Sequence, residues 1–240
     1  MVQFIQKRIP ITVATIDMDW HWTDVIKRFG KEAAPDQART PQEVFYNLSM
    51  PGWTGYSWNT ELFPDHVELL RWLHEKGFHV PMNVHPSQGI RFFEDCYAAV
   101  CNALGKDPAI KAPIPFDITD AAFLKSYMDD VHHPLEEEGV DFWWLDWQQG
   151  TVTNIPGLDP LWALNHYHTL DSARGETRPL ILSRYAGFGS HRYPLGFSGD
   201  AIISWKSLDF QPYFTTNAAN AGYTWWSHDI GGHMRGIQDD

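Results

Sequence analysis

The 240-residue chain has only two cysteines, no long apolar run and no signal-peptide pattern in residues 1–20. Cys96 and Cys101 lie in a segment typical of a helix, where their side chains point in different directions and a disulfide would need distortion. The longest apolar runs are far shorter than the roughly 20 residues that span a bilayer. The sequence therefore predicts neither a membrane span nor a leader, and it leaves the compartment open.

Basic residues are also scarce. Eighteen Lys and Arg residues stand against thirty Asp and Glu residues, which gives a net charge of −12 without any basic run. This charge argues against a nucleic-acid or anionic-membrane partner. The glycine motifs of dinucleotide- and phosphate-binding loops are missing, and so is the G-x-S-x-G motif of serine hydrolases.

Aromatic residues, in contrast, are abundant, with 12 Trp, 9 Tyr and 14 Phe. A single core does not easily hide so many indole rings. Trp and Tyr offer a flat apolar face and a polar tip, which suits stacking on a sugar ring and bonding to its hydroxyls. Composition alone favours a carbohydrate ligand about as strongly as plain core packing.

Strand-like apolar runs alternate with helical patterns along the chain, which is typical of an α/β fold. Helices are predicted over Asp65–Lys76, Thr119–Glu138 with a kink before Pro134, and Asp159–Ala173, whereas Met18–Phe63 is expected to be irregular. The predicted strands are Ile11–Asp17, Phe78–Val84, Val140–Asp146, Pro179–Arg184, Leu195–Asp200 and Gly222–Asp229.

Polar side chains stand at or just after the end of each predicted strand. These residues are Asp17, His85, Asp146, Arg184, Asp200 and Asp229. A (β/α)8 TIM barrel builds its active site at this place, whereas a doubly wound sheet uses only the strands near its switch point. We therefore predict a TIM barrel over residues 1–240, incomplete at its C-terminal end because only six strands are visible.

Asp146 and Asp200 are the best candidates for a catalytic pair, since glycoside hydrolysis needs two carboxylates on neighbouring strand ends. Trp143, Trp144 and Trp147 flank Asp146 and could hold a sugar. The alternative for each acid is a capping or ion-paired side chain at a strand-to-loop junction. No metal or organic cofactor is implied, because two carboxylates suffice for this chemistry.

Arg184 could hold sugar hydroxyls or set the charge of a neighbouring carboxylate, and otherwise forms an ordinary ion pair. Asp17 could accept hydrogen bonds from adjacent hydroxyls, and otherwise caps a loop. Four histidines could suggest a metal cluster, but their spacings match no ligand motif, so we favour buried, hydrogen-bonded rings. They are His85, His191, His228 and His233.

Four sequence blocks together resemble glycoside hydrolase family 31, the α-glucosidase and α-xylosidase family. They are Ile16-Asp17, Trp144-Leu145-Asp146, Ser183-Arg184 with Arg192 and Gly199-Asp200, and Asp229-Ile230-Gly231-Gly232. The resemblance implies a retaining, exo-acting α-glycosidase with Asp146 as nucleophile and Asp200 as general acid/base. It also implies that Asp17, Trp144, Arg184 and Asp229 bind an oligosaccharide or glycoside substrate.

The chain departs from the family after the nucleophile, where Trp147-Gln148-Gln149 replaces a Met-Asn-Glu type sequence. Glucose is the expected sugar because it is the most frequent one in the family, and xylose, galactose or an N-acetylated hexosamine are the alternatives. The flanking β-sandwich domains and the last barrel strand are not found, so we expect a catalytic-core fragment of low activity with an exposed hydrophobic edge. A sugar-binding remnant without turnover and a transglycosylase are the competing hypotheses.

Overall fold

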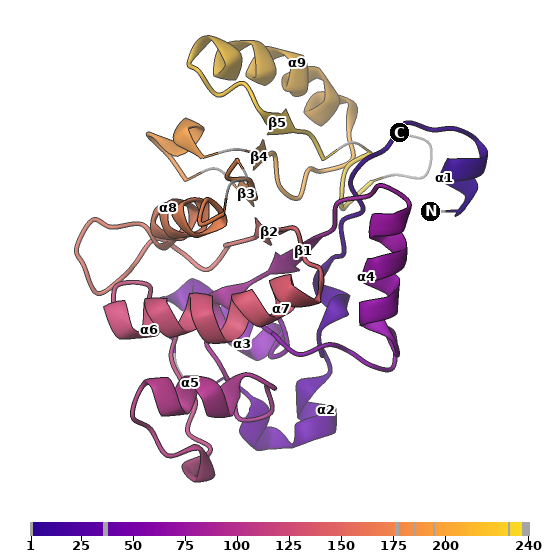
Figure 1. The fold of residues 1–240 in the computed structure, drawn as a ribbon. Coiled ribbons are helices and arrows are strands. Elements are labelled where there is room, and N and C mark those ends of the chain that lie inside the picture. Colours follow the sequence, from indigo (N-terminus) through magenta and orange to yellow (C-terminus); the bar gives the residue numbers. More distant parts are fainter. Residues whose placement is uncertain are drawn as a thin grey trace.

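A parallel sheet forms the centre of the computed structural model, which describes residues 2–35, 38–175, 178–184, 186–193, 195–229 and 231–236. Its strands follow one another in chain order, and each neighbouring pair is parallel (Figure 1). In a doubly wound sheet the spatial order of the strands reverses at a switch point. The unbroken order found here is that of a barrel wall. The strands are β1 Pro81–Val84, β2 Phe142–Leu145, β3 Ile181–Arg184, β4 Gly196–Phe197 and β5 Trp226–Ser227.

The predicted first strand, Ile11–Asp17, lies in parallel beside β1 but is not a continuous strand. Two isolated bridges join the segments, Val13 with His79 and Ile16 with Met82. A ladder between these bridges would need an N–H at position 81, and Pro81 has none. The prediction of a full strand was therefore wrong, although its position next to β1 was right.

Helices α4 (His66–Glu75) and α8 (Pro160–Ser172) form where predicted, each capped by an aspartate, Asp65 and Asp159, that accepts backbone N–H groups of the first turn. The predicted helix over Thr119–Glu138 is divided into three parts. These are α6 (Ala121–Ser126), the π-helical segment η5 (Tyr127–His132) and α7 (His133–Glu138). Pro134 lacks an N–H and cannot complete a regular α-helical hydrogen bond. The π-helical turns lie directly before it, at the place where a kink was predicted.

The stretch Met18–Phe63, predicted as irregular, contains a helix that the sequence analysis missed. Helix α3 (Pro41–Ser49) begins with a capping box, in which Thr40 and Glu43 satisfy each other's backbone N–H groups. The same stretch holds η1 (Met18–Trp20), α2 (Val25–Phe29) and η2 (Lys31–Ala33). The remaining elements are α1 (Val2–Gln6), η3 (Pro86–Gln88), α5 (Tyr97–Ala103), η4 (Pro108–Ile110), η6 (Ser190–Arg192) and α9 (Trp205–Asn220).

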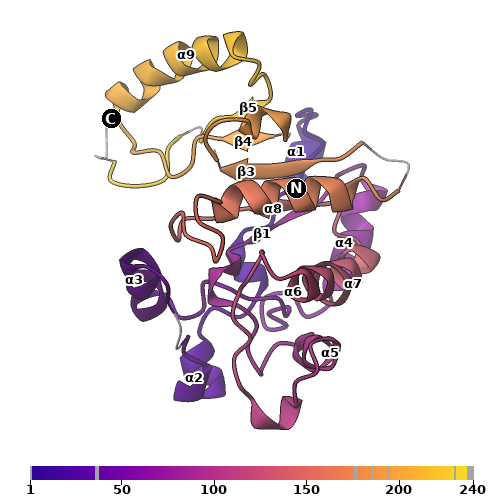
Figure 2. The ribbon, with the colours of Figure 1, turned by 90° about the vertical axis from the view of Figure 1, so that its left-hand side faces the viewer.

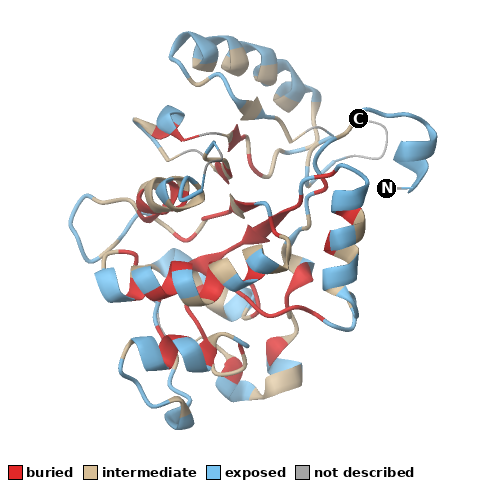
Figure 3. Ribbon diagram, in the orientation of Figure 1, coloured by how far each residue is buried: buried red, intermediate tan, exposed pale blue. Residues whose placement is uncertain are grey.

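Buried residues gather on β1, β2 and the helices packed against them, whereas α9 lies beside β5 at the far end of the sheet (Figures 2 and 3). None of the residues of α9 is buried, and its Trp205 and Tyr213 are 65% and 67% exposed. Helix α9 therefore exposes large hydrophobic side chains at the β5 end of the sheet. No helix in the described ranges has both the length and the apolar character needed to cross a bilayer.

We predict that Gly89→Ala destabilises the fold much more than Gly105→Ala. Both glycines have a left-handed backbone, with φ of +69° and +65°, but a Cβ at Gly89 would overlap the carbonyl oxygen of Ile114, whereas one at Gly105 meets nothing within 4 Å. The extra loss should be about 2 kcal/mol, because the bridge between Ile90 and Ile114 must open. Urea unfolding of both variants measures the difference, and equal losses would contradict the close approach.

Candidate active site

The register of the parallel strands brings their C-terminal ends to one edge of the sheet. Val84 of β1 is the partner of Leu145 of β2, so the residues that follow, His85 and Asp146, are neighbours as well. Arg184, the last residue of β3, pairs with Phe197 of β4. Successive side chains of a strand point to opposite faces, so residues two apart in the chain share a face. This edge therefore collects the side chains that the sequence analysis selected.

Arg184 binds both candidate carboxylates. Its Nε donates to Oδ1 of Asp146, and its Nη2 donates to Oδ2 of Asp200 at 2.9 Å. Gly199 makes this possible, because a Cβ at that position would overlap the guanidinium, and its φ of +67° suits glycine. The structure thus brings Asp146, Arg184 and Asp200 together around one guanidinium.

The two carboxylates have different surroundings. The side chain of Asp146 is 7% exposed and that of Asp200 is 32% exposed. Burial opposes the ionisation of Asp146, but its contacts with His85 and Arg184 outweigh burial and lower the pKa of Asp146 to about 2. Asp146 is therefore a buried, firmly ionised carboxylate, whereas Asp200 is accessible at the side of the same guanidinium.

Two residues of this site, Gln148 and Tyr46, were not predicted as site residues, and a third, His85, was predicted at a strand end but without its partner. The Nε2 of His85 lies 3.2 Å from Oδ2 of Asp146, and the Nε2 of Gln148 donates to Oδ1 of Asp146 at 3.3 Å. Tyr46, on α3, donates its hydroxyl to Oε1 of Gln148 at 3.3 Å. The capping box could have indicated α3 itself, but nothing local to α3 shows which part of the sheet it meets.

Helix α3 forms one wall of the site. The ring of Tyr46 packs edge-on against that of Trp53, with 4.3 Å between the ring centroids. Trp53 packs in the same way against His85, with 4.9 Å between the centroids. Gln42 donates to the backbone oxygen of Gln148. A cavity of about 330 Å³ lies between α3 and the strand ends, large enough for a sugar ring. It is lined by Gln42, Trp147, Gln148, Gly150, Thr151, Asp159, Leu161 and Arg184.

The tryptophans around Asp146 do not all face the site. Trp144 shares the face of Asp146 and packs edge-on against Phe197 at 5.4 Å. Trp143 points the other way, since its Nε1 donates to Glu136 of α7 at 2.8 Å. Trp147 is buried and donates to the backbone oxygen of Gly150 at 2.6 Å. The expectation that all three could hold a sugar was wrong for Trp143, because strand alternation turns it toward the helices.

The two outer aspartates are less closely tied to the pair. Asp229 accepts the backbone N–H of Ala201, the residue after Asp200, at 2.8 Å. Asp17 is exposed, and its Oδ1 accepts the backbone N–H of Met18 at 2.7 Å as the cap of η1. Ile230, part of the block that contains Asp229, lies outside the described residues.

The four histidines have separate partners. His85 contacts Asp146, His228 contacts Thr215 and Gln211, and His233 lies 4.0 Å from Asp200. His191, on η6, is exposed, and so is His233, so the expectation of buried rings was wrong for these two. These rings therefore do not share one site within the described parts of the chain.

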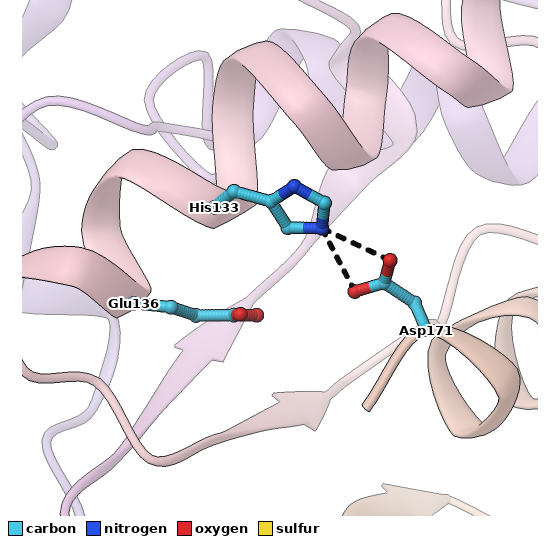
Figure 4. A group of neighbouring side chains, drawn as sticks. All are labelled: His133, Glu136 and Asp171. Carbon is cyan, nitrogen blue, oxygen red and sulfur yellow. Dashed lines mark hydrogen bonds and ion pairs between the residues drawn. The ribbon is translucent and has the colours of Figure 1, made fainter. Parts of the chain in front are cut away.

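One other group of side chains in the described residues has the donor types and spacing of a metal site, namely His133, Glu136 and Asp171 (Figure 4). His133 lies 2.9 Å from Asp171, and Arg174 forms ion pairs with both Asp171 and Glu136. Trp143 also donates to Glu136. Because Arg174 already forms ion pairs with both carboxylates, this group is an ion-pair network that joins α7 to α8.

Comparison with known proteins gives the family. The sequence model of the glycosyl hydrolases family 31 TIM-barrel domain matches residues 1–240. The chain belongs to glycosyl hydrolase family 31. Its sheet and helices are accordingly those of the family's TIM barrel, as the sequence predicted.

Two curated relatives show how far the likeness extends. An α-xylosidase of Emericella nidulans is 23% identical over 202 residues, which cover 75% of this chain and 26% of the relative. An α-xylosidase of Saccharolobus solfataricus is 23% identical over 237 residues, which cover 89% of this chain and 31% of the relative. The chain thus spans between a quarter and a third of the length of these relatives.

Solved structures of the family share the fold. A family 31 α-xylosidase from Xanthomonas citri superposes with a TM-score of 0.62 at 17% identity, over 96% of this chain and 26% of that one. A family 31 α-xylosidase from a soil metagenome, complexed with xylose, gives a TM-score of 0.64 at 19% identity. The match covers 98% of this chain and 34% of that one.

We predict that Asp146 adds acid sensitivity to the fold. Its folded pKa of about 2 lies below the ordinary 3.8, so its contribution to stability is complete above about pH 4 and is lost as the pH falls toward 2. Between pH 5 and 2 the unmodified chain should lose about 2 kcal/mol more unfolding free energy than Asp146→Asn. Urea unfolding across this range measures the loss, and parallel curves for the two proteins would refute it.

Proposed function

We propose that this chain carries the catalytic machinery of a retaining α-glycoside hydrolase that removes terminal sugars. The observation that supports it best is the contact of one guanidinium with two carboxylates in unlike surroundings. A buried, ionised Asp146 suits a nucleophile, and an accessible Asp200 suits a group that gives and takes a proton.

In the proposed mechanism Asp146 attacks the anomeric carbon while Asp200 protonates the departing oxygen. A covalent glycosyl ester of Asp146 results, and Asp200 then takes a proton from the water that hydrolyses it. Arg184 stabilises the ionised Asp146 before the attack. The carboxylate of Asp200 must leave Arg184 or share it when the leaving group arrives, since Arg184 occupies the space between the two acids.

We propose a substrate with a gluco-configured ring, either glucose or xylose. These sugars share the arrangement of their ring hydroxyls and differ in the hydroxymethyl group at C5. Glucose is the sequence-based expectation. Xylose is a second candidate because both curated relatives described above are named α-xylosidases.

Asp17, Trp144 and Asp229 are the proposed contacts to the sugar bound next to the scissile bond. Trp144 lies on the same face as Asp146 and offers an indole, while the two aspartates come from strand ends on either side of the acid pair. Residues 1–240 are proposed as the catalytic core of the parent protein. Sugar binding without turnover, and transfer to another sugar instead of water, are the alternatives that the experiments below separate.

We predict that the chain hydrolyses 4-nitrophenyl α-glucoside or α-xyloside and leaves the β-anomers intact. Asp146→Ala and Asp200→Ala should each lower kcat at least about 1000-fold, because each removes a group that acts in the transition state. Release of nitrophenolate measures turnover, and NMR of the first product should show the α-anomer.

The controls distinguish the alternatives. Azide should restore turnover to Asp146→Ala as a β-glycosyl azide and to Asp200→Ala as an α-glycosyl azide, since the small anion replaces a different acid in each. Retained turnover in Asp146→Ala would refute its role as nucleophile. Bound sugar without turnover in any form would favour the binding protein, and disaccharides formed with added acceptor would favour the transglycosylase.

A further inference from the structure

His85 is a buried ring at the floor of the site, directly after β1. Its side chain is 3% exposed, it packs against Trp53, and its backbone oxygen accepts a hydrogen bond from the hydroxyl of Thr54. These contacts fix both the backbone and the plane of the ring. The ring therefore presents Nε2 to the carboxylate of Asp146, 3.2 Å away, in one orientation.

The polar part of this ring serves Asp146 alone within the described residues. Nδ1 is buried and has no hydrogen-bond partner there, while Nε2 faces Oδ2 of Asp146. A ring kept only for packing would cost less if it were apolar, because a buried polar atom without a partner is unfavourable. The contact with Asp146 is thus the feature that explains a histidine at this position.

The hydrogen bonds of Asp146 are distributed unevenly over its two oxygens. Oδ1 receives two donors, the Nε of Arg184 and the Nε2 of Gln148, whereas Oδ2 receives the Nε2 of His85. Each carboxylate oxygen has two lone pairs in the carboxylate plane. Among the described residues, both lone pairs of Oδ1 are therefore engaged, and one lone pair of Oδ2 receives no donor.

We propose that His85 is a positioning residue that fixes the carboxylate plane of Asp146 and makes Oδ2 the attacking oxygen. This inference rests on the proposed function, in which Asp146 is the nucleophile. With donors on both oxygens, the carboxylate cannot rotate without breaking a buried hydrogen bond, so the open lone pair of Oδ2 keeps one direction.

The bonding changes then follow. The bond from Oδ2 to the anomeric carbon forms as the bond from that carbon to the leaving oxygen breaks, and the proton of Asp200 passes to the leaving oxygen. Oδ1 becomes the carbonyl oxygen of the ester and keeps the hydrogen bonds of Arg184 and Gln148. The carboxylate loses its negative charge when Oδ2 becomes the ester oxygen. Only the hydrogen bond from His85 to Oδ2 then has to weaken.

The pair His85→Gln and His85→Met tests the proposal. The amide of Gln can place an N–H near the position of Nε2, whereas Met has a similar length and no donor. We expect His85→Met to lower kcat/KM about 10- to 100-fold and His85→Gln to stay within about threefold of the unmodified chain.

The pH profile adds a measurement that loss of packing alone would leave unchanged. Among the described residues, the ionisable groups around Asp146 are His85, Arg184 and Tyr46, with Asp200 on the other side of Arg184. Without the donor at position 85 the ionised form of Asp146 is less favoured, so the acid limb of kcat/KM should move up by about one pH unit in His85→Met and stay in place in His85→Gln. Equal behaviour of Met and Gln variants would overturn the proposal.

A double-mutant cycle decides the matter even without turnover. If His85 and Asp146 interact, His85→Met combined with Asp146→Asn should reduce the equilibrium constant of folding about tenfold less than the product of the two single losses. If the loss in the double variant equals the product of the two single losses, the positioning role is overturned. Retained turnover in Asp146→Ala together with the expected tenfold coupling would instead refute the proposed function and still support the contact between His85 and Asp146.

Discussion

The guanidinium of Arg184 lies between two carboxylates that would repel each other without it, and the geometry of the site depends on this cation. It neutralises one of the two negative charges at the edge of the sheet and holds Asp146 and Asp200 at a fixed separation. Its position depends in turn on the glycine at 199, because any larger side chain there would enter its space. The pair of acids, the cation and the glycine therefore form one unit.

The parallel register explains why so much of this unit can be read from the sequence. Apolar runs followed by a charged residue place that residue at the carboxyl end of a strand, and parallel strands align those ends. For Asp146, Arg184 and Asp200, this rule was sufficient to bring the residues together. It also gave the order of the strands, although β4 and β5 are only two residues long in the structure.

Other features depend on contacts that no local pattern reveals. Pro81 interrupts the ladder to the N-terminal segment, a loss that is visible only when its partner strand is known. The direction of Trp143 follows from the alternation of β2, but its hydrogen bond to Glu136 depends on where α7 packs. His85 was assigned correctly to a strand end and yet its partner was missed, because proximity to Asp146 requires the register of β1 against β2.

Helix α3 stands apart from this arrangement, since it reaches the site through side-chain contacts of Gln42 and Tyr46 with Gln148 and is not part of the sheet. The acids and the cation belong to strand ends, whereas one wall of the cavity belongs to a separate stretch of chain. Under the proposed function, substitutions on the cavity side of α3 would change the wall that faces the sugar while the strand ends keep the two acids in place. Tyr46 is the exception, because it reaches Asp146 through Gln148.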